Sequence, residues 1–488
     1  MREMFEFFKE NIPDYVIEIS KKLSLRGYKA FLVGGSVRDL LLHKIPNDYD
    51  VTTDAKPEEI MSIFEKSVPT GEKFGTITVI ETDRLKESHA VEVTTFRSEE
   101  NYVDGRWPSK VGFTSEIKTD LSRRDFTINA IALDLEKFSV ALRKKENTYD
   151  IKEFIYDPFG GLQDLESKLI KAVGDPLERF SEDGLRSVRG CRLAAQLGFI
   201  IEENTKKAMT MTLHITQKVS IERFRDELLK LLYKSPKPSV GFNCMKEVGI
   251  LAIFLPELLD CVGIVQPEFH SEDVYDHTMS TIDIADDRVK LAALFHDIGK
   301  PRTKVVDENG IHFYGHDIVG AEMTREIMKR LKFSNAETEN TALLVRYHMF
   351  NYPSADWRKN NLDLNGEGDH GWSDGAVRRL IRNVGGDDQI EKLLLLRLAD
   401  ATSNKKSKYD RRELTLLSER ISQVRAKSTV MTVSDLAISG KDLIREFNLQ
   451  PSKIIGDILK YLLEIVLDDP ILNQRETLLK LVKEYLNK

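Results

Sequence analysis

The stretch from Phe31 to Thr53 constrains this chain more tightly than any other part of it. An apolar run ends at Val33, a glycine-rich turn occupies residues 34–36, and a short amphipathic segment follows. Two aspartates then lead into the β-branched run Val51-Thr52-Thr53. This order predicts a strand, a glycine turn, a helix and a second strand.

The two aspartates, Asp48 and Asp50, have a spacing that would bring their side chains together. Residues i and i+2 of a strand point to the same face, so the two carboxylates would lie side by side. Paired carboxylates suit two Mg²⁺ ions, which lie roughly 3.5–4 Å apart in two-metal phosphoryl-transfer sites. A solvated acidic strand end is the simpler alternative, but the ordered glycines and arginine nearby favour the metal site.

The glycine turn could approach a phosphate closely. Gly34 and Gly35 carry no side chain, and the backbone N–H groups that open the helix at Ser36 would face an anion. Arg38 adds a fork of hydrogen-bond donors for phosphate oxygens. The stretch therefore predicts a site for a triphosphate next to the paired acids.

Length and charge limit the class of protein. A chain of 488 residues is too long for one hydrophobic core, so roughly two to four domains are expected. The formal net charge of −7 argues against binding nucleic acid through bulk positive charge. It is compatible with a local basic groove.

The three cysteines, Cys191, Cys244 and Cys261, form no CxxC pair. This argues against a disulfide framework or a thiolate zinc site and fits a reducing compartment. The N-terminus is rich in acidic residues and lacks the apolar core of a signal peptide. No apolar run has the length needed to span a bilayer. We therefore expect a cytoplasmic protein without a membrane partner.

Strand signals at residues 76–80 and 90–96 indicate that the head is an α/β unit with a small sheet. Glu92 lies in the middle of the second of these strands. It could be a third catalytic carboxylate that polarises the attacking hydroxyl, or equally a charge at the sheet edge. Residues 97–113 are polar, contain Gly and Pro and lack periodicity, which predicts a long loop.

The segment from Ser122 to Ala130 is a second dense motif and predicts a short helix that runs into a strand. Arg124 could pair with a triphosphate. Asp125 and Asn129 are four residues apart, on one helical face, and could hold a ribose hydroxyl. A salt-bridged surface helix is the alternative.

From about residue 160 onward the sequence predicts mainly helices. Asp183, Arg186 and Arg189 recur at a spacing of three and so share a helical face. An accepting Asp beside a donating Arg matches both cytosine and adenine, whereas uracil and guanine present a carbonyl where the amino group is needed. A buried mismatch costs about 1–3 kcal/mol, which gives roughly ten- to hundredfold discrimination. Ordinary ion pairs along a helix are the alternative.

Four of these motifs occur together, and in this order they resemble one family. The residues Gly34 to Asp39, Asp48 with Asp50, Arg123 to Ala130 and Glu182 to Arg186 resemble the motifs of the bacterial-type (class II) tRNA nucleotidyltransferases, the CCA-adding enzymes. That family includes poly(A) polymerases and belongs to the DNA polymerase beta superfamily. The resemblance covers at least residues 28–235.

The resemblance implies roles for the individual residues. Asp48 and Asp50 would bind the metals, and Asp183 with Arg186 would template C and A in turn. The other nucleotide contacts implied by the family pattern are Gly35, Arg38, Arg124, Asp125, Arg189 and Arg192. Arg223 resembles the family's last motif, which supports the base-reading helix.

The expected loop around Asp104-Gly105-Arg106 resembles the CCA-adding members more than the bacterial poly(A) polymerases. Trp107 stands where a second basic residue is expected, so the sequence departs from the family pattern there.

A second set of metal-ligand residues follows Pro267 in the order His, His-Asp, His, His, Asp. Its members are His277, His296, Asp297, His316, His348 and Asp400. Imidazole and carboxylate together suit a divalent transition metal or Mg²⁺. The order resembles the HD-domain phosphohydrolases, which implies attack of a metal-activated water on phosphorus. A retained fold that only binds tRNA is the alternative.

We therefore expect an α/β nucleotidyltransferase head of the DNA polymerase beta type with a small mixed sheet, followed by an all-α neck, a body with an HD domain, and a tail. The expected domains are the catalytic head (1–160), the helical neck and body (161–265), the HD domain (266–425) and the helical tail (426–488). The hypothesis for function is addition of C, C and A to the tRNA 3′ end from CTP and ATP, without a nucleic-acid template. Two Mg²⁺ ions would serve the head, and a second divalent metal site would lie in the HD domain.

Three alternatives remain open. The chain could be a specialised CC-adding, A-adding or poly(A) enzyme of the same family. It could instead be an HD-type phosphodiesterase whose N-terminal half senses a nucleotide. The third alternative, a non-catalytic RNA-binding protein, fits the intact acidic pair least well.

Overall fold

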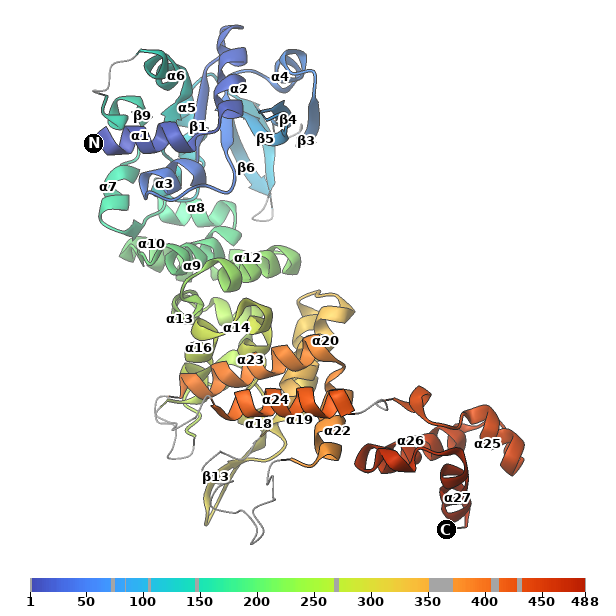
Figure 1. Cartoon of the computed structure of the whole chain (residues 1–488). Coiled ribbons are helices and arrows are strands. Elements are labelled where there is room, and N and C mark those ends of the chain that lie inside the picture. Colours follow the sequence, from blue (N-terminus) through green and yellow to red (C-terminus); the bar gives the residue numbers. More distant parts are fainter. Residues whose placement is uncertain are drawn as a thin grey trace. The chain divides into compact units, whose positions relative to one another are not determined.

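The structure is a computed structural model that describes residues 2–71, 75–83, 85–103, 107–144, 149–266, 272–350, 372–404, 412–427 and 432–487. The chain divides into two compact units, Met1–Pro256 and Glu257–Lys488 (Figure 1). The domain limits expected at residues 160, 265 and 425 are finer than this division and stay predictions.

A seven-stranded mixed sheet organises the start of the first unit, in the order β3-β4-β5-β2-β1-β8-β9. Its strands are β1 (Ala30–Val33), β2 (Asp50–Thr53), β3 (Ser67–Gly71), β4 (Thr76–Thr82), β5 (Ser88–Thr95), β8 (Ala132–Asp134) and β9 (Ile155–Tyr156). β1 pairs antiparallel with β2 and β8, whereas β2 and β5 are parallel. The small mixed sheet expected from the sequence is confirmed.

The register of this sheet positions the acidic residues. Val33 pairs with Asp50, so the first acid of β2 lies where β1 gives way to the glycine turn. Val51 pairs with Val93 on the adjacent parallel strand. Asp50 and Glu92 each come one residue before this pair, so they are neighbours on the two strands. All four residues of β1 are buried, so this junction is anchored in the hydrophobic core.

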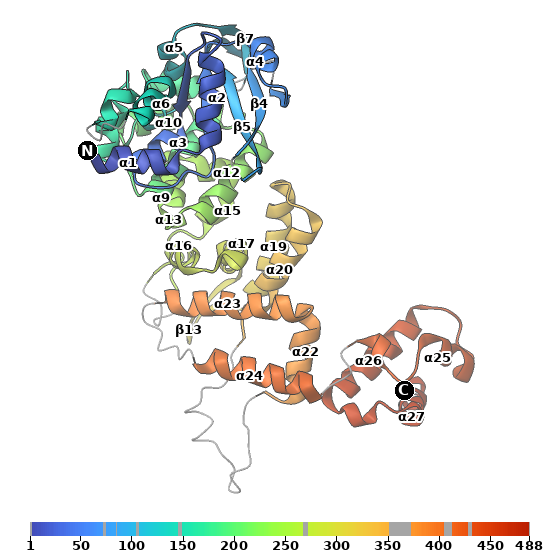
Figure 2. The same cartoon turned by 45° about the horizontal axis from the view of Figure 1, so that its top comes forward.

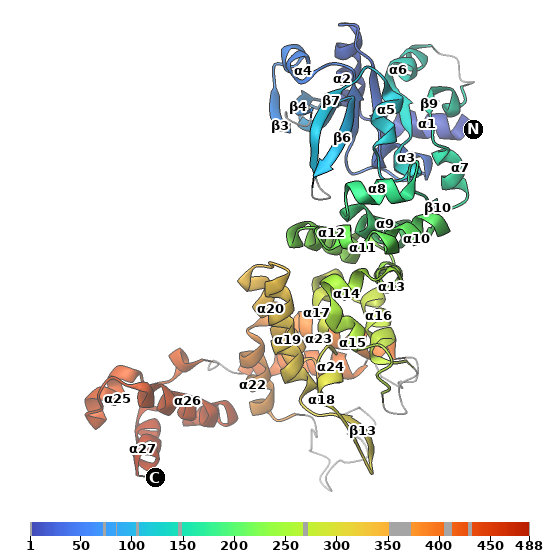
Figure 3. The ribbon, with the colours of Figure 1, turned by 180° about the vertical axis from the view of Figure 1, so that it is seen from behind.

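Helices surround the sheet (Figures 1 and 3). The helices are α1 (Arg2–Asn11), α2 (Asp14–Ser24), α3 (Gly35–Leu41), α4 (Pro57–Ile63), α5 (Ile117–Ser122), α6 (Leu135–Arg143) and α7 (Gly161–Glu166). Phe31 and Val33, on one face of β1, pack in a cluster with Phe96, Leu121 and Val173. Burial of such side chains contributes about 1.5–3 kcal/mol each.

Residues 97–103 and 107–113 form a strand pair, so the predicted long loop is wrong. β6 (Arg97–Val103) and β7 (Trp107–Phe113) run antiparallel, with Arg97 opposite Phe113 (Figure 3). They form a separate two-stranded sheet, which explains why they lack the one-sided apolar alternation of a core strand. Asp104, Gly105 and Arg106 lie outside the described residues.

The segment after α5 is extended, and the predicted continuous helix through residue 130 is wrong. Phe126 has β-region dihedrals, and only Thr127–Asn129 forms a 3₁₀ turn. The backbone pairs with the chain around Ala172 instead: Thr127 N–H donates to Lys171 O and Val173 N–H to Asp125 O. These long-range bonds replace the intrahelical ones.

The rest of the first unit is helical, with one small parallel sheet of β10 (Leu169–Ile170) and β11 (Ile200–Ile201) that the sequence did not predict. The helices are α8 (Pro176–Glu182), α9 (Leu185–Leu197), α10 (Glu203–Met211), α11 (Leu213–Thr216), α12 (Ile221–Lys234), α13 (Pro238–Val248) and α14 (Ile250–Phe254). Both α12 and α13 pack against α9, whose Val188 and Cys191 are fully buried.

Among its described residues, the second unit is helical apart from the antiparallel pair β12 (Lys304–Asp307) and β13 (Gly310–Phe313). Its helices are α15 (Pro256–Asp260), α16 (Val274–Ile284), α17 (Lys290–Phe295), α18 (Lys300–Thr303), α19 (His316–Arg330), α20 (Asn335–Tyr347), α22 (Asp374–Val384), α23 (Asp387–Ser403), α24 (Arg412–Lys427), α25 (Gly440–Phe447), α26 (Lys453–Asp468) and α27 (Arg475–Leu486). Helices α19 and α20 lie side by side (Figures 2 and 3).

The last three helices have a hydrophobic core of their own. Its fully buried members are Leu443, Ile458, Leu462, Val466, Leu467, Leu478 and Val482. Among the described helices, none combines the length and the apolar character that a bilayer span requires.

Candidate active site and metal centre

One large cavity of the first unit collects the site residues expected from the sequence. Its volume is about 910 Å³. The expected residues on its wall are Gly34, Gly35, Arg38, Asp48, Asp50, Glu92, Arg124, Asp125, Asn129, Asp183, Arg186, Arg189 and Arg192. Ser36 is not on the wall, because its buried hydroxyl donates back to Val33 O at 2.9 Å.

Three carboxylates gather at the β2 end of the cavity. Asp48 is exposed just before β2, Asp50 opens the strand, and Glu92 projects from β5 beside it. Burial, together with the charges of Asp48 and Glu92, raises the pKa of Asp50 to about 6, although Arg124 acts in the opposite direction. The three carboxylates repel one another when they are ionised. A divalent cation bound between them would relieve this repulsion.

Gly34 separates the acids from the nearest arginine. It has a positive φ of 77°, and a Cβ atom at this position would lie 3.0 Å from Arg124 Nη1 and 3.8 Å from Asp50 Oδ2. A side chain there would fill the narrow gap between these two charged groups. The glycine turn is therefore required both by its backbone conformation and by the close approach of the arginine.

Two arginines face the cavity, Arg38 from a buried position and Arg124 from a partly buried one. The Arg38 guanidinium donates to Asp39 Oδ1 and, through Nη1, to Asn129 Oδ1 at 2.7 Å. Arg124 forms an ion pair of 3.5 Å with the fully buried Asp120. Its buried Nε has no hydrogen-bond partner among the described residues. Arg124 therefore retains donor capacity that an anionic ligand could satisfy.

Asp125 links the head to helix α9. Its Oδ2 accepts from Arg189 Nη1 at 3.0 Å and its Oδ1 from Asn129 Nδ2 at 3.1 Å. Burial alone would raise the pKa of Asp125, but Arg189 and the Asn129 hydrogen bond outweigh it and lower the pKa to about 2. Asp125 and Asn129 thus meet as expected, although through a 3₁₀ turn and not through a helical face.

The expected Asp183–Arg186 helical face does not form, because α9 begins at Leu185 and Asp183 has extended dihedrals before it. Asp183 is instead paired with Arg223 of α12 at 2.6 Å. Both residues nevertheless line the cavity. Arg186 donates to Arg179 O at 2.8 Å, to Arg123 O at 2.9 Å and to the Glu182 carboxylate.

Arg192 and several residues that the sequence analysis missed complete the wall. Arg192 donates from Nε to Glu227 at 2.5 Å and from Nη1 to Gln196 at 2.6 Å. The missed basic residues are Arg97, Arg123, Lys230 and Lys234. Lys230 and Lys234 are four apart on α12, a helical spacing that could have indicated them. Arg97 begins a strand that the sequence did not predict.

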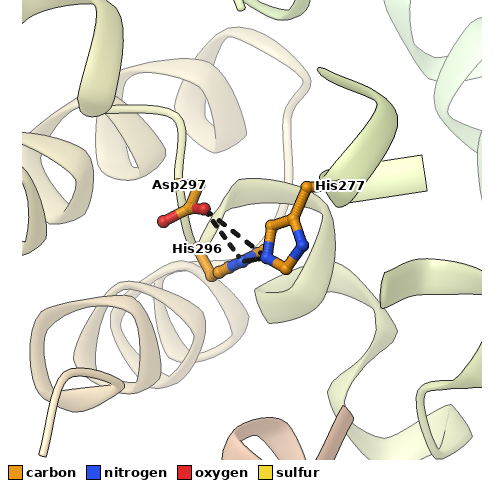
Figure 4. A group of neighbouring side chains, drawn as sticks. All are labelled: His277, His296 and Asp297. Atoms are coloured by element: carbon orange, nitrogen blue, oxygen red, sulfur yellow. Dashed lines mark hydrogen bonds and ion pairs between the residues drawn. The ribbon is translucent and has the colours of Figure 1, made fainter. Parts of the chain in front are cut away.

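The second unit gathers the other predicted ligands around Asp297. His277 lies on α16, His296 and Asp297 follow α17, His316 opens α19, His348 ends α20 and Asp400 lies on α23. Asp297 Oδ2 is 3.3 Å from His296 Nε2 and 3.7 Å from His277 Nε2 (Figure 4).

The other carboxylates and histidines extend this cluster. Asp297 Oδ1 is 3.6 Å from His316 Nε2 and 3.7 Å from His348 Nε2. Asp400 Oδ1 is 3.0 Å from His277 Nε2. Two sets of possible metal ligands therefore share Asp297: one with His277 and His296, the other with His316 and His348.

Backbone carbonyls orient three of the four imidazole rings. The Nδ1 atoms of His296, His316 and His348 lie 2.8, 2.7 and 2.6 Å from the carbonyl oxygens of Ala293, Phe313 and Val345. A proton on each Nδ1 leaves the Nε2 lone pair directed at the cluster, as in metal-binding histidines. The buried Nε2 atoms of His316 and His348 have no hydrogen-bond partner among the described residues. The set therefore fits a divalent cation.

Two basic residues stand next to this cluster. Lys300 Nζ donates to Asp297 Oδ2 at 2.6 Å, and Arg397 Nη1 donates to Asp400 Oδ2 at 2.7 Å. Burial opposes ionisation of Asp297, but His296 and Lys300 hold its pKa well below the usual range. Burial lowers the pKa of His316. These conditions favour a carboxylate at Asp297 and a neutral imidazole at His316, the forms that bind metals. At His296 the effect of burial is outweighed by the neighbouring carboxylates, which raise its pKa.

Comparison with known proteins places this architecture in a class. Residues 30–171, which carry the mixed sheet and the acid cluster, match the Poly A polymerase head domain. Together with relatives that match nearly the whole chain, this makes the chain a nucleotidyltransferase. Residues 198–261 match the probable RNA and SrmB-binding site of polymerase A, residues 269–405 the HD domain, and residues 394–482 the putative tRNA nucleotidyltransferase domain 2.

Within that class the chain belongs to the CCA-adding enzymes. It is 32% identical over 484 residues to the CCA-adding enzyme of Enterococcus faecalis, covering 99% of this chain and 97% of that protein. It is 29% identical to the CCA-adding enzyme of Ligilactobacillus salivarius, with 98% of each chain covered.

Solved structures agree in fold. The Bacillus stearothermophilus CCA-adding enzyme in complex with CTP has a TM-score of 0.64 at 22% identity, covering 97% of this chain and 99% of that chain. The Thermotoga maritima CCA-adding enzyme complexed with tRNA_CCA has a TM-score of 0.55 at 18% identity, with 98% of each chain covered. The family resemblance and the fold class expected from the sequence are thus confirmed.

Proposed function

We propose that this chain adds C, C and A to the 3′ end of tRNA from CTP and ATP without a nucleic-acid template. The observation that carries the proposal is the single cavity in which Asp48, Asp50 and Glu92 face Arg124 and the α9 residues. The names of the relatives support the same activity, and solved relatives bind CTP, ATP and tRNA_CCA.

The proposed reaction joins the terminal ribose hydroxyl of the tRNA to the α-phosphate of the nucleotide. A bond forms between the hydroxyl oxygen and the α-phosphorus, the bond from that phosphorus to the bridging oxygen breaks, and pyrophosphate leaves. Two divalent cations bound by Asp48 and Asp50 would lower the pKa of the hydroxyl and stabilise the leaving group. Glu92 is proposed to orient the hydroxyl from the neighbouring strand.

The head residues around the acids would hold the nucleotide. Arg38 is buried and Arg124 is partly buried, so both guanidinium groups can neutralise phosphate charge without becoming fully hydrated. Asp125 and Asn129 are proposed to bind the ribose, with Arg189 fixing the position of Asp125 at 3.0 Å.

The base-reading proposal rests on the hydrogen bonds left available at Asp183 and Arg186. Asp183 accepts from Leu185 N–H and twice from Arg223, which leaves one of its approximately four acceptor positions. Arg186 uses both protons of Nη1 and one of Nη2, so Nε–H and one Nη2 proton remain without partners among the described residues. One acceptor beside one donor matches the amino group and ring nitrogen of cytosine or adenine.

The test is an end-addition assay. A tRNA that ends at the discriminator base is incubated with CTP and ATP together and with each alone, and the products are sequenced. Complete CCA supports the proposal. Addition of only CC, only A or a poly(A) tail would assign the chain to the corresponding specialised enzyme.

Arg186→Ala should relax the choice of base while leaving some turnover. Unchanged preference for CTP and ATP over UTP and GTP would contradict the base-reading role.

We also propose a phosphohydrolase activity for the HD domain, because four histidines lie around Asp297 and the Nε2 atoms of two of them are buried without hydrogen-bond partners among the described residues. A bound divalent metal would activate a water for attack on phosphorus. Lys300 and Arg397 would balance the phosphate charge.

Reciprocal variants separate the two activities. Asp297→Asn should abolish hydrolysis of a 2′,3′-cyclic nucleotide in the presence of Mg²⁺, Mn²⁺ or Ni²⁺ and leave CCA addition intact. Asp50→Asn should do the reverse. Hydrolysis without any CTP incorporation would favour a phosphodiesterase with a nucleotide-sensing head. Addition without hydrolysis would favour an HD fold that only binds tRNA.

A further inference from the structure

Two of the three cysteines, distant in the sequence, meet inside the first unit. Cys191 is fully buried on α9, and Cys244 is partly exposed on α13. Their Sγ atoms are 2.8 Å apart although 53 positions separate the residues. A disulfide bond is about 2.05 Å long, so the sulfur atoms need to approach by less than about 1 Å to bond.

The backbones of α9 and α13 are close enough for a bond between the two helices. Gly241 precedes Cys244 by almost one helical turn, and a Cβ atom on it would lie 3.1 Å from Cys191 O. The absence of a side chain at residue 241 therefore lets the two helices approach at this point. The pairing joins elements that already pack together.

Neither thiol belongs to the chemistry described above. Neither is on the wall of the cavity, and within the described part of the chain neither joins a group of possible metal ligands. Burial raises the pKa of the Cys191 thiol, and the neighbouring Cys244 raises it further. The more accessible Cys244 is thus the sulfur that an oxidant reaches first.

We propose that Cys191 and Cys244 are a reversible oxidation site that forms an intramolecular disulfide when the protein meets a peroxide. The Cys244 thiolate attacks one peroxide oxygen, an S–O bond forms, the O–O bond breaks, and hydroxide leaves as water. The Cys191 sulfur then attacks the Cys244 sulfenic acid, the S–S bond forms, the S–O bond breaks, and a second water leaves. Hydrogen peroxide is reduced to two waters, and two thiols are oxidised to one disulfide.

The bond would have two consequences. It would close the loop between residues 191 and 244, which restricts the unfolded chain and so raises the melting temperature of the first unit. It would also consume the sulfenic acid before further peroxide converts it to sulfinic acid, which thiols cannot reduce. Helix α9 carries Arg186, Arg189 and Arg192, which line the cavity. The disulfide would therefore attach α9 covalently to α13 next to the cavity.

The experiment treats the full-length protein with a small molar excess of hydrogen peroxide, blocks free thiols and digests with trypsin without reduction. Cys191 lies in the tryptic peptide of residues 190–192 and Cys244 in that of residues 235–246, because cleavage does not occur between Lys237 and Pro238. We expect these two peptides to be linked, with a loss of two hydrogens. Incubation with dithiothreitol should restore two free thiols.

Variants and a melting measurement complete the test. Cys244→Ser should give no linked peptide and no change of melting temperature on oxidation, whereas wild type should gain several degrees. Cys261→Ser is the matched control and should behave as wild type, because Cys261 is a buried thiol that donates to Glu257 O. Linked peptides that involve Cys261, or a Cys244 that becomes sulfinic acid or stays free in a folded protein, would overturn the proposal.

Discussion

The Asp183 carboxylate accepts two hydrogen bonds from the Arg223 guanidinium, with Oδ2 2.6 Å from Nη2 and Oδ1 3.1 Å from Nη1. The residues are 40 positions apart, so α12 fixes the orientation of an acid that precedes α9. Arg186 is fixed separately, through Glu182 and the carbonyl groups of Arg123 and Arg179. The two proposed base-reading groups are therefore held by two different sets of partners.

Replacing Arg223 should damage base selection. In Arg223→Ala, Asp183 keeps only the Leu185 N–H hydrogen bond at 3.0 Å and becomes free to rotate. Loss of charge-assisted hydrogen bonds worth about 1.5–3 kcal/mol should reduce the preference for CTP over UTP about ten- to hundredfold. The measurement is kcat/KM for each nucleotide. Arg225→Ala on the same helix, away from the cavity wall, is the control. Equal selectivity of both variants would contradict the role of Arg223.

Neutralising the paired acids should stop nucleotide addition without unfolding the protein. Asp48→Asn and Asp50→Asn should each lower addition by about 10³-fold or more, because the groups that hold the cations lose their charge.

The pKa of Asp50 is raised to about 6. Its ionisation therefore opposes folding, and its contribution to stability is lost as pH rises through about 6. Asp50→Asn should accordingly raise the melting temperature in metal-free buffer at pH 7.

Glu92→Gln tests the third carboxylate in the same assay. A loss as large as that of Asp50→Asn would make Glu92 part of the catalytic group. Retention of nearly full activity would identify Glu92 as a charge on the sheet surface.

Gly34→Ala should impair nucleotide binding beyond the effect of its backbone strain. The residue has a φ of 77°, and the new Cβ would stand 3.0 Å from Arg124 Nη1, so the guanidinium must move. Gly27→Ala is a matched control, because Gly27 has a φ of 84° but a Cβ atom added there would have no neighbour within 4 Å. Both variants should lose about 1 kcal/mol of stability. Only Gly34→Ala should weaken CTP binding, as measured by calorimetry; equal affinities would remove the proposed contact.

Acid should weaken the link between Asp125 and Arg189. The pKa of Asp125 is lowered to about 2 in the folded protein. The stability that this group contributes is therefore present above about pH 4, the pKa of an unfolded Asp, and is lost as pH falls toward 2. Wild type should lose about 1 kcal/mol more than Asp125→Asn between pH 6 and pH 3. Urea unfolding at both values measures the difference, and parallel losses in the two proteins would contradict the shift.

The HD domain should lose bound metal when its bridging carboxylate is changed. Asp297 is near all four histidines, so Asp297→Asn should reduce divalent metal content more than His316→Ala, which affects one set of ligands. Metal content measured after dialysis against Mn²⁺ gives the result without any activity assay. Chelation should also lower the melting temperature of wild type but not of Asp297→Asn. Equal metal content in wild type and both variants would contradict the assignment.

Local motifs were the part of the molecule that the sequence predicted best. The acids, the glycine turn and Arg38 lie within one short stretch, so strand periodicity and turn chemistry are enough to place them around β1 and β2. The order of the four histidines and two acids likewise indicated one cluster. The same local rules failed for residues 97–113, because β6 and β7 pair with each other outside the main sheet and carry no core-strand pattern.

Contacts between distant segments were not predictable from spacing. The interaction of Asp183 with Arg223 depends on how α12 packs against α9, and residues near 172 hold the segment after α5 extended. The three cysteines showed no paired spacing, yet the packing of α13 on α9 brings two of them together. In each case the missing information was a tertiary contact rather than a local propensity.

Main-chain carbonyls, and not side chains, set the rings of His296, His316 and His348. A substitution at Ala293, Phe313 or Val345 changes the side chain but keeps the oxygen that holds the imidazole. The orientation of the metal-ligand histidines therefore does not depend on which side chains occupy these three positions. The ligand geometry can stay as it is while the side chains of these three neighbours change during evolution.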